Sequence, residues 1–352
     1  MEKFRGNSCK YGLPLSVYFC HRNINTYPMK KTFASITLLC MACLNVQCQK
    51  AETQKTDNTT IETPEDNQDS TTTTMVNPFN FETRTVKLNS GYEMPIIGIG
   101  TFMLSTSQAE ESVYNALKVG MRLIDTADIY GNEVGVGRGI RRAMKDFGIK
   151  REEIFVTSKL WTSSFNNADK EVDERLERLG LDYVDLLLLH HTAAYDEEAY
   201  QAMERGVKAG KIHSIGLSNF YEKDVDRMMK IATIKPAVLQ NETHPYHQSR
   251  SVKNHIAKLG TILEAWFPLG GRGTGIQTLS RHSTITNIAK AHGKSAYQVL
   301  LRWHLQSGNI VIPGSKNAAH IAEDYNIFDF ELTADEMKAI NELECNHRFA
   351  SY

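Results

Sequence analysis

The stretch Leu123-Ile-Asp-Thr-Ala-Asp-Ile-Tyr-Gly-Asn-Glu133 begins as an apolar, β-like run and ends in polar residues. The same layout returns in Ile154–Trp161, Asp185–His191 and Ser214–Phe220. Short apolar runs that are bounded by polar residues predict β-strands. Because barrel enzymes place their chemistry at the carboxyl ends of strands, the four stretches together predict strands and a candidate active site.

The chain after residue 80 alternates further apolar runs with helical stretches. Helices are predicted over 108–119, 167–179, 197–209 and 225–232, and the apolar runs are Arg122–Asp125, Ile154–Ser158, Val184–His190, Ile212–Leu217, Ala237–Gln240 and Ile262–Trp266. Roughly eight repeats are completed by the last part of the chain. It contains a helix over Ala296–Gln306, a strand over Ile310–Pro313, a helix near His320, the short run Phe328–Phe330 and a helix over Ala334–Glu344. This alternation predicts parallel strands joined by crossover helices.

Eight repeats predict a closed (β/α)8 TIM barrel, in the α/β class. The rival is an open doubly wound sheet, but the first strand–helix unit does not open with G-x-G-x-x-G, which disfavours a cofactor held in the Rossmann manner. Ahead of the repeats, Thr85–Leu88 and Tyr92–Ile97 flank a turn that contains Gly91. They predict an N-terminal β-hairpin that caps the bottom of the barrel.

Composition limits the classes of partner. The chain has 352 residues, of which 41% are apolar, and its formal net charge is −1. Residues 81–352 are about the size of one α/β barrel. The balanced charge disfavours a nucleic-acid partner, because a phosphate-binding surface normally shows a basic excess.

The first 80 residues form a different kind of sequence. From Met29, two Lys, an apolar run and small residues with Cys follow the layout of a secretory signal peptide, so residues 29–48 are predicted to direct export and residues 1–28 to be an upstream artefact of the start codon. Cys43 and Cys48 are both candidates for the lipid-bearing cysteine of a bacterial lipoprotein, although the residues before each match that pattern poorly. The expected location is periplasmic or lipid-anchored, with the cytoplasm as the alternative. Residues 49–80 are polar and of low complexity, which predicts a disordered linker.

Cysteines and histidines give little support for cross-links or metals. Five of the six cysteines precede residue 81, and only Cys345 follows it, so a disulfide framework is not expected. His244 and His247 are close in sequence, but no Cys or carboxylate spacing completes a recognisable zinc set. We therefore predict no metal site.

The four opening stretches, in this order, resemble the aldo-keto reductase family, and the resemblance runs from about Phe81 to about Phe349. The Asp-x-Ala-x-x-Tyr-x-Asn-Glu pattern that starts at Asp125 carries much of it. The resemblance implies reduction of aldehydes and ketones to alcohols by direct hydride transfer from a nicotinamide cofactor. The short tail after Phe349 is similar to that of the bacterial branch of 2,5-diketogluconate, glyoxal and methylglyoxal reductases, which implies an open cleft for small polar carbonyls.

The resemblance assigns the catalytic roles to Asp125, Tyr130, Lys159 and His190. Tyr130 corresponds to the general acid, although the unperturbed pKa of tyrosine, about 10, is far above neutral pH. A lysine at ~4 Å in a medium of dielectric ~20 favours tyrosinate by about 4 kcal/mol, or about three pKa units, before desolvation opposes it. Lys159 is expected to do this, held charged by Asp125.

His190 is expected to orient the substrate carbonyl, although residue type favours a satisfied core histidine at that place. In the same way, an isolated Asp at a strand end is more often a turn former or a helix cap. The family pattern reverses both readings. His191 departs from the pattern, since many relatives carry Trp there, and it is expected with Phe102 and His190 in the wall of the substrate pocket.

The resemblance also implies how the cofactor is held. Ser218, Asn219 and Gln240 correspond to positions that hydrogen-bond the nicotinamide carboxamide, and Trp266 to the ring that stacks on it, which fixes the face that gives up hydride. The other expected cofactor residues are Thr101, Leu269, Gly271, Ser315, Lys316 and Asn317, with Glu323 and Asp324 at the adenine. Polar groups at strand ends also cap loops, but the Gly-x-Ser-Asn-Phe and Gln-x-x-x-His-Pro-Tyr contexts favour the cofactor.

NADPH is the expected cofactor, and NADH is the alternative. Relatives that select the 2′-phosphate usually carry Lys where this chain has Gly314 and Arg where it has His320, so Lys316 is expected to act as the phosphate's point charge. The expected protein is a monomer whose partner is a small carbonyl substrate, with membrane contact limited to a lipid anchor. A cofactor-binding accessory or sensor barrel without turnover is the alternative function.

Overall fold

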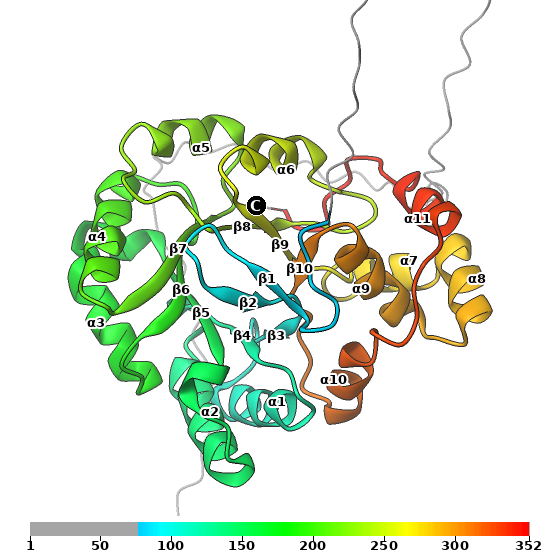
Figure 1. The fold of residues 1–352 in the computed structure, drawn as a ribbon, viewed down its shortest axis with the longest axis horizontal. Helices are drawn as coiled ribbons and strands as arrows, with labels where there is room; N and C mark the ends of the chain where they lie inside the picture. Colours follow the sequence, from blue (N-terminus) through cyan, green and yellow to red (C-terminus); the bar gives the residue numbers. More distant parts are fainter. Residues whose placement is uncertain (1–76, 352) are drawn as a thin grey trace, which may run out of the picture. The chain divides into compact units, whose positions relative to one another are not determined.

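The computed structural model describes residues 77–351, and the predictions for residues 1–76 lie outside them. Eight parallel strands, each paired with the next, form a ring that Figure 1 shows end-on. They are β3 (Gly98–Gly100), β4 (Leu123–Asp125), β5 (Phe155–Leu160), β6 (Val184–Leu189), β7 (Ile212–Ser218), β8 (Val238–Glu242), β9 (Ile262–Trp266) and β10 (Asn309–Val311). The ring closes between its first and last strands, where the Gly100 amide donates to the Pro313 carbonyl at 3.0 Å. The predicted (β/α)8 barrel is confirmed.

Helices surround the strands as an outer layer (Figure 1). They are α1 (Thr106–Lys118), α2 (Glu133–Phe147), α3 (Ala168–Leu179), α4 (Asp196–Lys208), α5 (Glu222–Met229), α6 (Arg250–Ala257), α7 (Thr274–Ser280), α8 (Ser283–His292), α9 (Ala296–Gln306), α10 (Ala318–Tyr325) and α11 (Ala334–Asn341). Local signals set their ends: Ser105 forms a capping box at the start of α1, and Gly180, at φ 64°, ends α3. Within residues 77–351, no helix is long and apolar enough to cross a membrane.

The strand that completes the eight is β3, and not the run Phe328–Phe330 that the sequence suggested. That run has no strand pairing and lies between α10 and α11. β3 lacked a visible signal because two of its three residues are glycines. Each is required by a close approach: a Cβ on Gly98 would collide with Leu123, and one on Gly100 would lie 2.8 Å from the Ile312 carbonyl oxygen.

The predicted hairpin is present as β1 (Thr85–Lys87) and β2 (Glu93–Pro95), paired antiparallel. Met94 is fully buried and joins the barrel core. The Asn89 side chain donates to the carbonyl of Pro236 at 2.9 Å, just before β8, and the hydroxyls of Ser90 and Ser214 lie 2.8 Å apart. The hairpin therefore covers the amino-terminal end of the strands.

The barrel begins earlier than residue 81. Asn77 donates to the carbonyl of Leu305 at 2.8 Å, and Phe79 is buried in the core. Asn80 forms a bridge with Thr85 at the start of β1. Residues 77–80 were predicted as part of the linker, and the structure corrects this. Burial of the Phe79 ring in the core is favourable enough to hold this segment on the barrel, although its neighbours in the sequence are mostly polar.

Candidate active site

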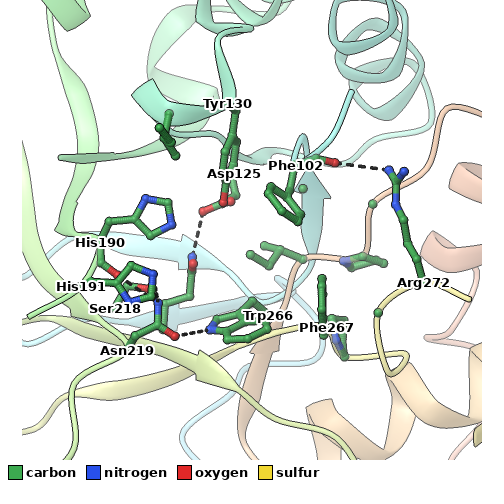
Figure 2. Close-up of a pocket in the computed structure, with 18 of the residues that line it drawn as sticks. Phe102, Asp125, Tyr130, His190, His191, Ser218, Asn219, Trp266, Phe267 and Arg272 are labelled. Carbon is green, nitrogen blue, oxygen red and sulfur yellow. Dashed lines mark hydrogen bonds between the residues drawn. The ribbon is translucent and has the colours of Figure 1, made fainter. Parts of the chain in front are cut away.

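A cavity of about 550 Å³ opens at the carboxyl end of the strands (Figure 2). It is bounded by the ends of β4, β7, β8 and β9 and by the loops that follow the strands. Many of the predicted site residues line it together: Phe102, Asp125, Tyr130, His190, His191, Ser218, Asn219, Gln240, Trp266, Leu269 and Gly271. Residues from widely separated parts of the sequence thus converge on one cavity, as expected for a barrel enzyme.

Lys159, on β5, is fully buried and joins Asp125 to Tyr130. Its Nζ is 2.6 Å and 2.7 Å from the two carboxylate oxygens of Asp125 and 3.4 Å from the Tyr130 hydroxyl oxygen. Burial works against a charge on Lys159, but the neighbouring Asp125 and then Tyr130 outweigh it, so the pKa of Lys159 is raised. The ammonium therefore stays protonated beside the tyrosine hydroxyl.

Tyr130 ends the 3₁₀ turn Asp128–Tyr130, which a buried ionic cluster holds in place. The guanidinium of Arg175, almost fully buried, lies 3.0 Å from the Asp128 carboxylate and 3.2 Å from that of Glu133, at the start of α2. Asp128 also accepts from the backbone N–H of Trp161 at 3.2 Å. Because the turn is tied to α2, α3 and the end of β5, the tyrosine hydroxyl has a fixed position above Lys159.

His190 is a neutral imidazole in the cavity wall. Burial, and next the positive charge of Lys159, lower the pKa of His190 to about 2. Its ring lies edge-on to that of Tyr130, with 5.8 Å between the ring centroids, and its Nδ1 is buried without a hydrogen-bond partner among residues 77–351. An unsatisfied buried nitrogen beside a cavity is costly in the empty protein and suits a polar group that arrives with a ligand.

Asn219 joins two of the other cavity residues. Its Nδ2 donates to the His190 carbonyl at 2.9 Å, and its Oδ1 accepts from the indole N–H of Trp266 at 3.1 Å (Figure 2). Asn219 adopts φ 59°, a left-handed conformation that asparagine tolerates. The side chain predicted to bind the cofactor thus also fixes the orientation of the Trp266 ring.

Some predicted cofactor residues lie away from this cavity. Thr101 is fully buried, and its hydroxyl donates to the Asp125 carbonyl at 2.9 Å, so it supports the strand end. Ser315, Lys316 and Asn317 lie outside the cavity wall, next to the start of α10, where Asn317 caps the helix. Further along α10, Glu323 is half-buried, and burial and then Glu323 raise the pKa of the buried Asp324 to about 7.

The sequence did not single out several residues that shape the site. Trp161, Phe267 and Arg272 line the cavity, and the Arg272 guanidinium donates to the Phe102 carbonyl at 3.4 Å across its mouth (Figure 2). Trp161 was visible at the end of an apolar run, whereas Arg272 lies in a Gly-rich loop without a local signal. Glu264 was also missed, although an acidic residue inside the run Ile262–Trp266 is unusual for a buried strand.

The cavity suits a flat aromatic ring with a polar substituent. The Trp266 side chain forms one wall, and Ser218 and Gln240 present polar groups beside it. Within the described range 77–351, no three His, Cys, Asp or Glu side chains are grouped to hold a metal ion, and His244 instead contacts Glu242 at 3.1 Å. The Trp266 ring and these polar groups fit a nicotinamide ring.

Comparisons with known proteins agree with this geometry. Residues 96–344 match the model of the Aldo/keto reductase family. The chain is 40% identical to an NAD(P)H-dependent D-xylose reductase of Candida tropicalis, over 75% of this chain and 94% of that protein, and 42% identical to glyoxal reductase of Bacillus subtilis, over the same two shares. Its fold is similar to the crystal structure of a Bombyx mori aldo-keto reductase in complex with NADP, with a TM-score of 0.71 and 34% identity over 76% of this chain and 94% of that one.

Proposed function

The chain belongs to the aldo/keto reductase family, and from this we propose that it reduces small polar aldehydes and ketones to alcohols with NADPH, with Tyr130 as the proton donor. The family resemblance predicted from the sequence is confirmed, as is the enzyme class, an oxidoreductase acting on carbonyl groups. The observation that carries the proposal is the buried chain from Asp125 through Lys159 to Tyr130, with its 3.4 Å approach of ammonium to hydroxyl.

Lys159 gives Tyr130 its role as an acid. The ammonium lies beside the hydroxyl in a site shielded from water, where it stabilises negative charge on the phenolate oxygen. Tyr130 therefore gives up its proton to a carbonyl oxygen more easily than a free tyrosine. Asp125 accepts from Lys159 through both oxygens and keeps the ammonium charged and aimed.

His190 takes the second place beside the substrate oxygen. Because its pKa is lowered to about 2 by burial and then by Lys159, the imidazole is neutral and a poor proton donor compared with Tyr130. A neutral imidazole still offers one N–H to a carbonyl oxygen. We propose that His190 orients the substrate carbonyl beside Tyr130, since the centroids of the two rings are 5.8 Å apart.

The cofactor supplies a hydride to the carbonyl carbon when it is bound. Ser218, Gln240 and Trp266 would hold the nicotinamide, with Leu269 and Gly271 along the cavity wall. Ser315, Lys316 and Asn317 would hold the adenosine end, near the start of α10. The relatives named for NADPH or solved with NADP support this cofactor, and Lys316 is the cation we assign to the 2′-phosphate.

The choice of small polar carbonyls rests on the shape and chemistry of the cavity. Phe102 and Phe267 pack against each other in its wall, with 6.4 Å between their ring centroids. His191 adds a polar nitrogen to a wall that also contains the ring of Trp161, with 5.3 Å between the two ring centroids. Glyoxal and D-xylose, after which two relatives are named, are carbonyl compounds of this kind.

The test is the consumption of NADPH and, separately, NADH by the purified chain with methylglyoxal and with a sugar-derived ketone. We expect turnover of methylglyoxal with NADPH and a slower reaction with NADH. Tight NADPH binding without turnover of either substrate would contradict the proposal and favour an accessory protein.

We propose that the chain acts outside the cytoplasm, on the evidence of the signal-like residues 29–48, with Cys43 or Cys48 as an anchor point. Amino-terminal sequencing of the protein recovered from cell fractions tests this. A start at Met29 followed by cleavage is the expected result, and an intact amino terminus in the cytoplasmic fraction would contradict it.

We also propose that the protein is a monomer, because one barrel carries the complete set of catalytic side chains. Light scattering coupled to gel filtration should give the mass of one chain. A stable dimer at micromolar concentration would contradict this.

A further inference from the structure

Glu264 is a buried acidic side chain to which the mechanism above gives no role. It lies on β9, two residues before Trp266, and is fully buried. Its Oε2 accepts a hydrogen bond from Gln240 Nε2 at 2.8 Å, and its Oε1 is buried with no partner in the part of the chain that the structure describes. A carboxyl group in this position is costly to fold, so its presence calls for an explanation.

Gln240 connects Glu264 to the catalytic residues. The same Nε2 that donates to Glu264 also donates to Asp125 Oδ2 at 2.8 Å. A primary amide has two N–H donors and one carbonyl acceptor, so both donors of Gln240 are directed at carboxyl groups. The amide orientation is therefore fixed. Gln240 lines the cavity, and its carbonyl oxygen is the atom left to accept a hydrogen bond from a ligand.

Two charged groups act on Glu264 from the strands across the barrel. Asp125 on β4 disfavours a second negative charge, while Lys159 on β5 and the Gln240 amide favour it. Burial, and then Asp125, prevail and raise the pKa of Glu264 to about 8. At neutral pH the group is a carboxylic acid, and above pH 8 it adds a charge beside the Asp125–Lys159 pair.

We propose that Glu264 is a positioning residue for the reduction: it fixes the Gln240 amide so that its carbonyl oxygen faces the cofactor, and its proton sets the charge around Asp125 and Lys159. The inference rests on the proposed function. A nicotinamide carboxamide carries an NH2 group, which matches a fixed acceptor at Gln240. When Glu264 ionises, its negative charge makes it harder for Tyr130 to lose its proton.

Two variants separate these effects, and Glu204→Gln is the matched control. Glu204 is also buried and accepts hydrogen bonds, but from the backbone of Thr233 and Ile234, between α5 and β8. Glu264→Leu removes the acceptor and frees the Gln240 amide to rotate. Glu264→Gln keeps an acceptor but cannot ionise.

The measurements are the NADPH dissociation constant, by quenching of protein fluorescence, and the pH profile of kcat/KM for methylglyoxal from pH 6 to 10. We expect Glu264→Leu to weaken NADPH binding about tenfold, the effect of losing one fixed hydrogen bond. Glu264→Gln should keep the rate at pH 7 within about twofold and move the alkaline fall of the profile about one unit lower in pH. Glu204→Gln should change neither.

Unchanged NADPH binding in a folded Glu264→Leu would overturn the positioning role, and an unchanged profile in Glu264→Gln would overturn the charge effect. Circular dichroism identifies a variant that fails to fold. If Glu264→Leu does, the pH profile of Glu264→Gln still tests the proposal through the charge effect. If the wild-type protein has no turnover, the proposed function fails, whereas the NADPH affinities still test whether Glu264 orients Gln240.

Discussion

The two ends of the barrel differ in how their polar groups are paired. At the amino-terminal end, the hairpin places Met94 in the core, and Asn89 and Ser90 find partners on the strands beneath. At the carboxyl end, a lysine and two carboxyl groups are fully or almost fully buried, and His190 Nδ1 and Glu264 Oε1 have no partner among residues 77–351. The polar side chains of the hairpin turn thus find partners within the protein, whereas His190 Nδ1, in the wall of the cavity, is left without one among the described residues.

The difference indicates which end provides stability and which provides activity. A buried ion pair is often no more stabilising than apolar residues of the same size, while an apolar cap gains from every buried group. Substitutions at the hairpin should therefore lower stability and spare turnover. Substitutions at the cavity should do the reverse, provided that no buried charge is left without its partner.

The largest effect is expected at the Asp125–Lys159 pair. Lys159→Met should lower kcat/KM about 10³-fold, because Tyr130 loses the charge that favours its proton release. The single change also leaves Asp125 as an unpaired buried charge and should lower the free energy of unfolding by about 3–5 kcal/mol. Steady-state kinetics and denaturant unfolding measure the two effects.

The double variant Asp125→Asn/Lys159→Met separates them. Without the stranded charge it should recover most of the lost stability and none of the activity. Lys170→Met, at an exposed position of α3, is the matched control and should resemble the wild type. A double variant that remains as unstable as the single one would show that the pair holds the barrel together.

A smaller effect, of opposite kind, is expected at the hairpin. Met94→Ala removes a fully buried side chain and should lower the free energy of unfolding by about 2–5 kcal/mol, with kcat at 25 °C unchanged. Met103→Ala, where the side chain is 60% exposed, is the stability control and should change it by less than about 0.5 kcal/mol. Loss of turnover in folded Met94→Ala would break the separation between the two ends.

The smallest effect concerns the distant end of the cofactor. Lys316→Ala should raise the KM for NADPH roughly five- to tenfold and leave the KM for NADH unchanged, since one exposed cation on a phosphate contributes about 1 kcal/mol. Lys290→Ala, an exposed lysine of α8, should change neither constant. Equal changes in the KM for NADPH and for NADH would contradict the assignment of Lys316 to the 2′-phosphate.

That the candidate catalytic residues lie together could be predicted because their signals are local. Each lies at or just after an apolar run, and a parallel barrel brings all strand ends to one edge whatever the lengths of the helices between them. β3 could not be predicted in this way, since glycines that allow close strand contact carry no apolar signal. The predicted linker also ran on to residue 80, although Phe79 is buried in the core and Asn77 donates to the Leu305 carbonyl.

The supporting network could not be predicted, because it depends on contacts between distant segments. The sequence does not show that Arg175 reaches Asp128 and Glu133, or that Gln240 joins Asp125 to Glu264. The cofactor roles assigned to single residues from the family resemblance were incomplete for the same reason. Asn219 and Thr101 have protein partners that a motif does not reveal.

Tyr130→Phe tests the proton donor most directly, when methylglyoxal reduction and NADPH affinity are measured in the same preparation. Tyr195→Phe, an exposed tyrosine, is the control. We expect a loss of kcat of at least about 10³-fold, with NADPH affinity and thermal stability unchanged. Reduction at more than about a tenth of the wild-type rate would contradict the assignment of Tyr130 as the proton donor.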